Sequence, residues 1–160
     1  MANLKKNIKQ NKARIAIVAA SFNDFITKGL LKACLMELQR QGLGKKQITT
    51  VWVPGAFEIP LTVLKLAKRK DIDAVICLGA VIRGETYHFE VVSNECARGI
   101  MQAALLSAKP VIMGVLTTDT VAQAQARAGV KGGNKGRDAA LDALEMIALL
   151  KACRSLRHAG

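Results

Sequence analysis

Apolar residues are concentrated in four short runs, each followed by a stretch in which apolar residues recur at helical spacing. The runs predict strands at 14–20, 48–53, 75–82 and 111–116. The run from Val75 to Ile82 contains no charged side chain, which is typical of a strand buried on both faces. Strands that alternate with helices predict a parallel sheet with right-handed crossovers and helices on both faces.

The predicted helices have recognisable ends. The first begins after Asn23 or Asp24, either of which would cap it, and stops at Gly42. The others are predicted at 57–70, 88–107, 121–127 and 137–155. Pro60 is tolerated because N–H groups in a first helical turn have no intrahelical partner. The sequence therefore predicts a single-domain α/β protein, a three-layer αβα sandwich around a four-stranded parallel sheet.

We place this domain at residues 14–155 of the 160-residue chain. Residues 1–13 are polar and basic and form either a flexible arm or an added edge strand, and residues 156–160 form a tail. The N-terminal stretch lacks the apolar segment of a secretory signal, and no run approaches the ~20 apolar residues of a membrane span. We therefore expect a cytoplasmic protein without a membrane partner.

Cysteine spacing and charge narrow the function classes. Cys34, Cys77, Cys96 and Cys153 show no C-x-x-C spacing and lie in apolar patterns, so we expect buried, reduced thiols and no metal site. The net charge of +12 is compatible with nucleic acid, an anionic surface or small anionic substrates. Aromatic residues do not accompany the basic ones, which argues against nucleic acid, although a basic nucleic-acid-binding module stays open as an alternative.

Three strand–helix junctions carry side chains suited to binding. Phe22 follows the first strand, Phe57 and Glu58 follow the second, and the segment 84–88 follows the third. Because the carboxyl ends of parallel strands share one edge of a sheet, we expect these groups to lie together. An aromatic platform, an acid beside an apolar wall, and a turn of free N–H groups with a histidine suit a planar, polyhydroxylated ligand that carries an anion.

The same residues also have purely structural interpretations. Glu58 could simply complement a helix dipole, and His88 could be a surface residue in a first helical turn. We expect Gly84 to adopt backbone angles that other residues resist, and Thr86 to offer a cap hydroxyl to the next helix.

The glycine-rich segment 129–136 does not fit a nucleotide-binding loop. Asn134 and Gly136 stand where a Walker A loop needs its second glycine and its Ser or Thr. Arg137 stands where the guanine-binding N-K-x-D pattern needs Asp, and no G-x-G-x-x-G follows the first strand. These departures argue against ATP, GTP and NAD.

Six segments, in one order and at consistent spacing, resemble those of the 6,7-dimethyl-8-ribityllumazine synthase family. They are S-F-N at 21–23, V-P-G-A-F-E-I-P at 53–60, G-A-V-I-R-G at 79–84, T-Y-H at 86–88, G-V-L-T-T at 114–118 and G-N-K-G at 133–136. The resemblance covers roughly residues 14–150 and implies a flavodoxin-like fold.

That family condenses 5-amino-6-(D-ribitylamino)uracil with 3,4-dihydroxy-2-butanone 4-phosphate and releases phosphate and water. The resemblance implies a transferase of riboflavin biosynthesis without a metal or a redox cofactor, and without a protein nucleophile, because the substrate amine attacks the ketone. The nearest alternative is a riboflavin synthase of the same fold. Phe57, Glu58 and Arg127 argue against it, because they suit a substrate that bears phosphate.

The resemblance also implies a role for each site residue. His88 would transfer protons, Phe22 would stack on the pyrimidine, and Lys135 would contact the pyrimidine. The ribityl chain would be held by Asn23, Ala56, Phe57 and Glu58, and the pyrimidine edge by the backbone of Ala80, Val81 and Ile82. The phosphate would meet the N–H groups of Glu85 and Thr86 and the side chain of Arg127, while Met113 and Gly114 would close the site.

An assembly is implied as well. Members of the family form pentamers and sometimes sixty-subunit capsids, so we expect a homo-oligomer whose active sites are shared between adjacent subunits, with riboflavin synthase as a potential partner. Two residues depart from the family's pattern. Met113 stands where an aromatic residue is frequent, and Glu85 places an acid beside the expected phosphate.

Overall fold

The computed structural model describes residues 12–129 and 133–155, so most of the basic arm and the whole tail predicted above lie outside the described residues. The elements follow one another as β1 (Ile15–Ala20), α1 (Asp24–Arg40), η3 (Lys45–Gln47), β2 (Ile48–Val53), η4 (Ala56–Glu58), α2 (Ile59–Ala67), β3 (Ala74–Ile82), α3 (His88–Ser107), β4 (Val111–Thr118), α4 (Val121–Ala128) and α5 (Lys135–Ser155). The predicted alternation of strands and helices is confirmed.

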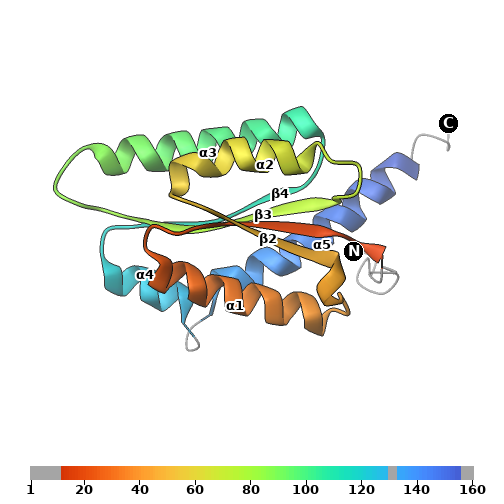
Figure 1. The fold of residues 1–160 in the computed structure, drawn as a ribbon, viewed down its shortest axis with the longest axis horizontal. Coiled ribbons are helices and arrows are strands. Elements are labelled where there is room, and N and C mark those ends of the chain that lie inside the picture. The colour runs from red at the N-terminus through yellow and green to blue at the C-terminus, as the bar shows by residue number, and fades with distance from the viewer. Residues whose placement is uncertain (1–11, 130–132, 156–160) are drawn as a thin grey trace.

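The four strands form one parallel sheet in the order β2-β1-β3-β4. Figure 1 shows α2 and α3 on one face and α1, α4 and α5 on the other, as three layers require. Strand β2 lies on one side of β1, and the chain then crosses to the other side of β1 to form β3 and β4. A crevice at the carboxyl ends of the strands is expected where the order reverses in this way.

Each face of the sheet has its own apolar core. Along β1, Ile15 and Ile17 pack toward α1 and α5, whereas Ala16, Val18 and Ala20 pack toward α2 and α3. All are buried, which explains why the sequence of this strand is apolar without alternation. The sheet is therefore a rigid support for the groups at its edge.

One close helix contact fixes the start of α5. A Cβ atom added to Gly136 would lie 2.0 Å from the carbonyl oxygen of Leu30, so the first turn of α5 packs directly against the backbone of α1. Any larger residue would force these helices apart, and Lys135 would move with them.

Three elements differ from their predicted bounds by two or three residues. Strand β4 continues to Thr118, because its ladder with β3 extends to the pair Ile82 and Thr118. Helix α5 begins at Lys135, two residues earlier than predicted, whereas α2 ends at Ala67. Helix α3 has the predicted bounds.

Cys34, Cys77 and Cys96 are buried free thiols, as predicted, but Cys153 is exposed. Burial raises the pKa of Cys34 to about 12 and that of Cys96 to about 11, which keeps both thiols protonated. Among the described residues, the helices are all too short or too polar to span a bilayer.

Candidate active site

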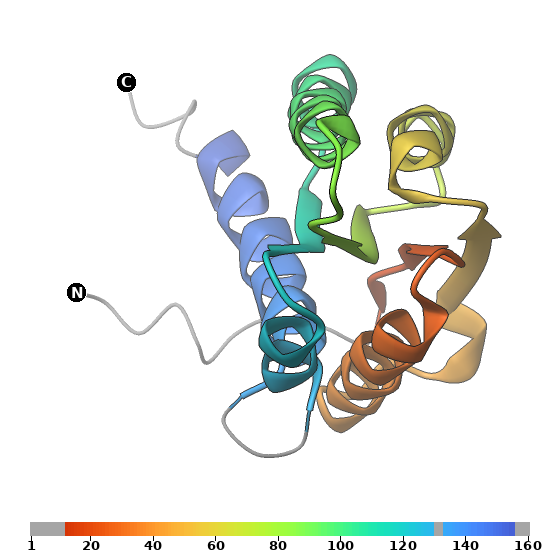
Figure 2. The same cartoon turned by 90° about the vertical axis from the view of Figure 1, so that its left-hand side faces the viewer.

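A groove of about 680 Å³ runs along the carboxyl ends of β1, β2 and β3. Figure 2 views the molecule from this edge, with the start of α3 above the strand ends and the start of α1 below them. Ten of the predicted site residues line the groove: Phe22, Asn23, Ala56, Phe57, Glu58, Ala80, Val81, Ile82, Thr86 and His88. It lies at the reversal of strand order, where α/β proteins bind ligands.

The loop after β1 is fixed by the end of β2. The N–H groups of Ser21 and Phe22 donate to the carbonyl oxygens of Val53 and Pro54, at 2.8 and 2.9 Å. The Phe22 side chain is left 72% exposed over the groove. An exposed aromatic ring on an anchored loop is well suited to stack on a planar ligand.

Asn23 occupies the N-cap position of α1, as predicted, but its side chain makes no capping hydrogen bond. Its backbone is in the left-handed conformation, with φ of 61°, and its Nδ2 donates to the carbonyl oxygen of Ala80 at 2.9 Å. The side chain thus crosses to β3 and leaves Oδ1 to accept a hydrogen bond from a ligand. Asn tolerates the left-handed region better than most residues, which explains its position in this loop.

The junction after β2 is a short 3-10 turn, η4, followed by α2. Phe57 is exposed beside the groove, and Glu58 lies at the start of α2. No ion pair of Glu58 is found among the described residues. Its carboxylate is therefore available both to the helix dipole and to ligand hydroxyl groups.

The turn from Gly84 to Tyr87 joins β3 to α3, and all of its residues are exposed. Gly84 does not adopt a left-handed backbone conformation, and a Cβ added to it would meet no atom within 4 Å. Our prediction that this position needs glycine for its backbone angles is therefore wrong. Instead, glycine leaves open space beside the groove.

His88 is the first residue of α3, and its side chain is exposed at the mouth of the groove. The hydroxyl of Thr86 accepts from the His88 N–H at 3.4 Å, a long contact, and Tyr87 rather than Thr86 occupies the N-cap position of α3. Glu85 does not line the groove, which is compatible with a contact made only through its N–H group.

Arg83, just before this turn, makes several contacts with the elements around it. Its guanidinium donates to the carboxylates of Glu90 in α3 and Asp119 before α4, and its Cζ lies 4.2 Å from the centroid of the Phe89 ring. The hydrogen bond from Arg83 lowers the pKa of Glu90. We call these four residues the Arg83 cluster.

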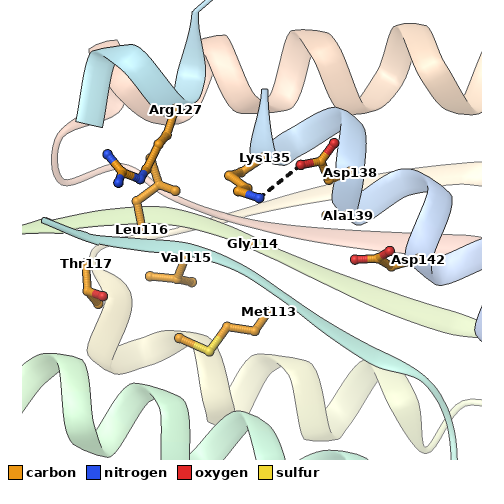
Figure 3. A pocket seen from close by; sticks show the side chains of 10 residues that line it. All are labelled: Met113, Gly114, Val115, Leu116, Thr117, Arg127, Lys135, Asp138, Ala139 and Asp142. Atoms are coloured by element: carbon orange, nitrogen blue, oxygen red, sulfur yellow. Dashed lines mark hydrogen bonds and ion pairs between the residues drawn. The ribbon is translucent and has the colours of Figure 1, made fainter. Parts of the chain in front are cut away.

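A second opening, of about 390 Å³, lies between β4 and the helices α4 and α5. It is lined by the other predicted residues Met113, Gly114, Arg127 and Lys135, and we call it the Arg127 pocket (Figure 3). Arg127 donates to the carbonyl oxygen of Gln123 in its own helix at 3.1 Å and pairs with no carboxylate of the described chain. Lys135 pairs with Asp138 at 3.1 Å.

Asn134 holds the two basic residues of this pocket in place. Its Nδ2 donates to the carbonyl oxygen of Ala128 at 2.8 Å, and its Oδ1 accepts from the N–H of Gly136 at 2.8 Å. The end of α4, next to Arg127, is thereby tied to the start of α5, which carries Lys135.

Sequence reasoning missed part of the groove. Phe89, Val91 and Val92 of α3 also line it. Val91 and Val92 lie three and four positions after His88, on one face of the helix, and this spacing could have identified them. The contacts of Arg83 with Glu90 and Asp119 had no signal in the sequence.

No lysine or arginine of the described residues lines the groove. Many basic residues lie at the opposite edge of the sheet, before the strands begin: Lys45, Lys46, Lys68, Arg69, Lys70 and Lys109. The net charge is therefore no evidence about the ligand of the groove. Among the described residues, no three His, Cys, Asp or Glu side chains lie close enough together to hold a metal ion.

Comparison with known proteins places these features in one family. Residues 12–151 match the family model of 6,7-dimethyl-8-ribityllumazine synthase. A protein of Protochlamydia amoebophila (strain UWE25) with that name is 49% identical over 158 residues, which cover 99% of this chain and 92% of the relative.

Proposed function

The chain belongs to the 6,7-dimethyl-8-ribityllumazine synthase family, and from this premise we propose that its substrates meet where the groove of one subunit faces the Arg127 pocket of the next. As a member, it is a transferase of riboflavin biosynthesis that acts on small molecules. It condenses 5-amino-6-(D-ribitylamino)uracil with 3,4-dihydroxy-2-butanone 4-phosphate. One observation carries the proposal: the residues expected in one site line two separate openings of the single chain.

In the groove, the pyrimidine stacks on Phe22 and meets the backbone of residues 80–82. Because Nδ2 of Asn23 is bound to Ala80, the Oδ1 atom of Asn23 accepts from a ribityl hydroxyl group. The carboxylate of Glu58 accepts from others, beside the apolar wall of Phe57.

The phosphate of the second substrate lies at the turn after β3, where the N–H groups of Glu85 and Thr86 face it. Arg127 of the neighbouring subunit supplies the positive charge. A guanidinium without a carboxylate partner can bind phosphate in a bidentate manner, which an ammonium group cannot. Lys135, from the same pocket, contacts the pyrimidine.

The reaction requires proton transfers more than it requires a protein nucleophile. The substrate amine attacks the ketone, water leaves as an imine forms, and phosphate is eliminated. The ribitylamino nitrogen then attacks the remaining carbonyl carbon, and a second water leaves as the new ring closes. His88 gives and takes the protons in these steps, a contribution of ~10²–10⁴ in rate. The juxtaposition of the two substrates supplies much of the remaining acceleration, up to ~7–11 kcal/mol.

A shared site needs a cyclic assembly, and the surface of α3 supports one. Met101, Leu105 and Leu106 are exposed apolar residues in its second half. Such a concentration of apolar side chains favours contact with another subunit. We expect a homopentamer as the basic unit, and the particle mass in solution distinguishes it from a decamer or a sixty-subunit capsid.

Complementation between two impaired variants tests the shared site. Subunits with His88→Ala and subunits with Arg127→Ala are unfolded together, refolded together and assayed for phosphate release at a butanone phosphate concentration far below the KM of Arg127→Ala, where both parents turn over little. With random mixing, roughly a quarter of the junctions between subunits pair an intact His88 with an intact Arg127, so activity returns. Mixed rings that stay as inactive as their parents would place both residues in the site of one chain.

A further inference from the structure

We infer that Arg83 is a positioning residue of this reaction, which holds the turn 84–87 and His88 in place through its contacts with Phe89, Glu90 and Asp119. The inference rests on the site proposed above. Arg83 does not line the groove or the Arg127 pocket, so it acts through other residues and not on the substrates.

The contacts of Arg83 join three parts of the fold. Its backbone N–H donates to the carbonyl oxygen of Thr118 at 2.9 Å, which keeps the end of β3 beside β4. Its Nε donates to Asp119 at 2.8 Å, and its Nη1 donates to Glu90 in the first turn of α3. The end of β3 is thus tied both to α3 and to the segment before α4.

Between Arg83 and α3, the turn itself receives little support. Residues 84–87 are all exposed, and the space beside Gly84 is empty to 4 Å. The long hydrogen bond from His88 to Thr86 lies within the turn and does not anchor it to the sheet. The Arg83 cluster connects the two ends of the turn, because Arg83 precedes it and Phe89 and Glu90 follow it. His88 is the residue next to Phe89.

The geometry requires arginine and not merely a positive charge. The guanidinium uses two different edges for two carboxylates while its flat face covers the Phe89 ring. A lysine ammonium is a point charge on a flexible stem and cannot make this set of planar contacts.

Exposure predicts how stability and catalysis respond. The side chains of Arg83, Glu90 and Asp119 are 42%, 29% and 66% exposed. Ion pairs with this exposure contribute little to global stability. A displacement of about 1 Å in a reacting group, in contrast, can lower the rate ~10²-fold. Loss of the Arg83 cluster should therefore affect turnover far more than unfolding.

The test compares Arg83→Gln and Arg83→Lys with the wild-type assembly by steady-state kinetics and thermal unfolding. We expect kcat to fall tenfold to a hundredfold in Arg83→Gln, and Arg83→Lys to recover only a minor part of the loss. The KM for the butanone phosphate should rise severalfold, because the turn presents N–H groups to the phosphate. The KM for the pyrimidine should stay within twofold, and the unfolding midpoint within about 4 °C.

Arg69→Gln is the matched control. Arg69 makes a two-bond contact with Asp71, at 3.0 and 2.9 Å, at the opposite edge of the sheet. Like Arg83→Gln, this variant removes an arginine and its ion pair with a carboxylate, but far from the groove. Its kcat should equal that of the wild type.

Glu90→Gln weakens only the contact with α3 and provides a second variant if Arg83→Gln does not fold. It should show the same pattern on a smaller scale, with a lower kcat and an unchanged KM for the pyrimidine. The inference is overturned if folded Arg83→Gln, or Glu90→Gln in its place, keeps kcat within twofold of wild type. It is also overturned if Arg69→Gln loses as much. Wild-type kinetics in both His88→Ala and Arg127→Ala would instead reject the proposed site.

Discussion

The side-chain Nδ2 of Asn23 lies 2.9 Å from the carbonyl oxygen of Ala80, and this hydrogen bond joins the loop after β1 to the end of β3 beside the groove. Phe22, the expected stacking surface, is the residue before Asn23. The position of the aromatic ring relative to the backbone of residues 80–82 therefore depends on this bond and on the left-handed conformation of Asn23, in addition to the backbone hydrogen bonds that hold the loop to β2.

Asn23→Ala should destabilise the protein by about 1–3 kcal/mol. The variant loses a hydrogen bond worth about 1 kcal/mol and places a residue with a Cβ, but without the local hydrogen bonding of Asn, in the left-handed region, at a similar cost. Asn23→Gly is the control, because glycine adopts this conformation freely and loses only the bond. Urea unfolding measures the free energy of unfolding of both variants and of the wild type. Equal stabilities for Asn23→Ala and wild type would contradict the role of the bond.

His88→Ala should lower kcat by ~10²–10⁴ and leave the KM of both substrates nearly unchanged, because a proton-transfer residue acts mainly on transition states. Some turnover should remain, since the two substrates are still held together. Tyr87→Phe, a change in the preceding exposed residue, should have wild-type kinetics. A kcat for His88→Ala within twofold of wild type would remove His88 from the mechanism.

Arg127→Ala should raise the KM for the butanone phosphate roughly tenfold to a hundredfold, because a charge-assisted contact with phosphate is worth ~1.5–3 kcal/mol. The KM for the pyrimidine should change much less. Arg127→Lys keeps the charge without the bidentate geometry. Its KM for the butanone phosphate should therefore lie between those of wild type and Arg127→Ala. Equal effects on both substrates would place Arg127 elsewhere.

Glu37 should make the stability of the protein depend on pH in the acid range. Its buried carboxylate accepts hydrogen bonds from Arg40, Gln41 and Arg137, and these, with that from Arg40 foremost, lower its pKa from 4.5 to about 2. The carboxylate of Glu37 therefore binds a proton less readily in the folded state than in the unfolded chain. The resulting stabilisation is complete above the unfolded pKa and is lost as the pH falls through about 2.

Glu37→Gln removes this titration, which urea unfolding between pH 6 and about 2.5 can measure. The difference in unfolding free energy between wild type and Glu37→Gln should shrink as the pH falls. A difference that is constant over this range would show that Glu37 has the same pKa in both states.

Apolar runs were sufficient to predict the sheet, because parallel strands covered on both faces have no polar alternation to obscure them. Helix α3 was predicted with the correct bounds, since its apolar spacing is regular and the glycine turn marks its start. The same reasoning was wrong about the capping bond of Asn23 and about Gly84. The side chain of Asn23 finds a partner in β3, a contact that no local pattern reveals, and the glycine at 84 leaves space and does not provide a special backbone angle.

Most of the lining of the groove was predicted, but the division of the expected residues between two openings was not. Strand ends and helix starts indicated which residues share an edge of the sheet, and this was enough for the groove. That Arg127 and Lys135 line a separate opening depends on how α4 and α5 pack beside β4. Sequence periodicity carries no information about that packing.

Arg83 has a consequence for the assembly as a whole. In a head-to-tail ring, the groove of a subunit faces one neighbour and its Arg127 pocket faces the other. Glu90 stands on the groove side of Arg83, while Asp119 stands before α4, which carries Arg127. In the ring proposed above, Arg83 would therefore connect two different reaction centres through a few bonds. A shift of α4 on phosphate binding at one junction would be passed to His88 at the next, always in the same rotational sense, so that consecutive turnovers around the ring need not be independent.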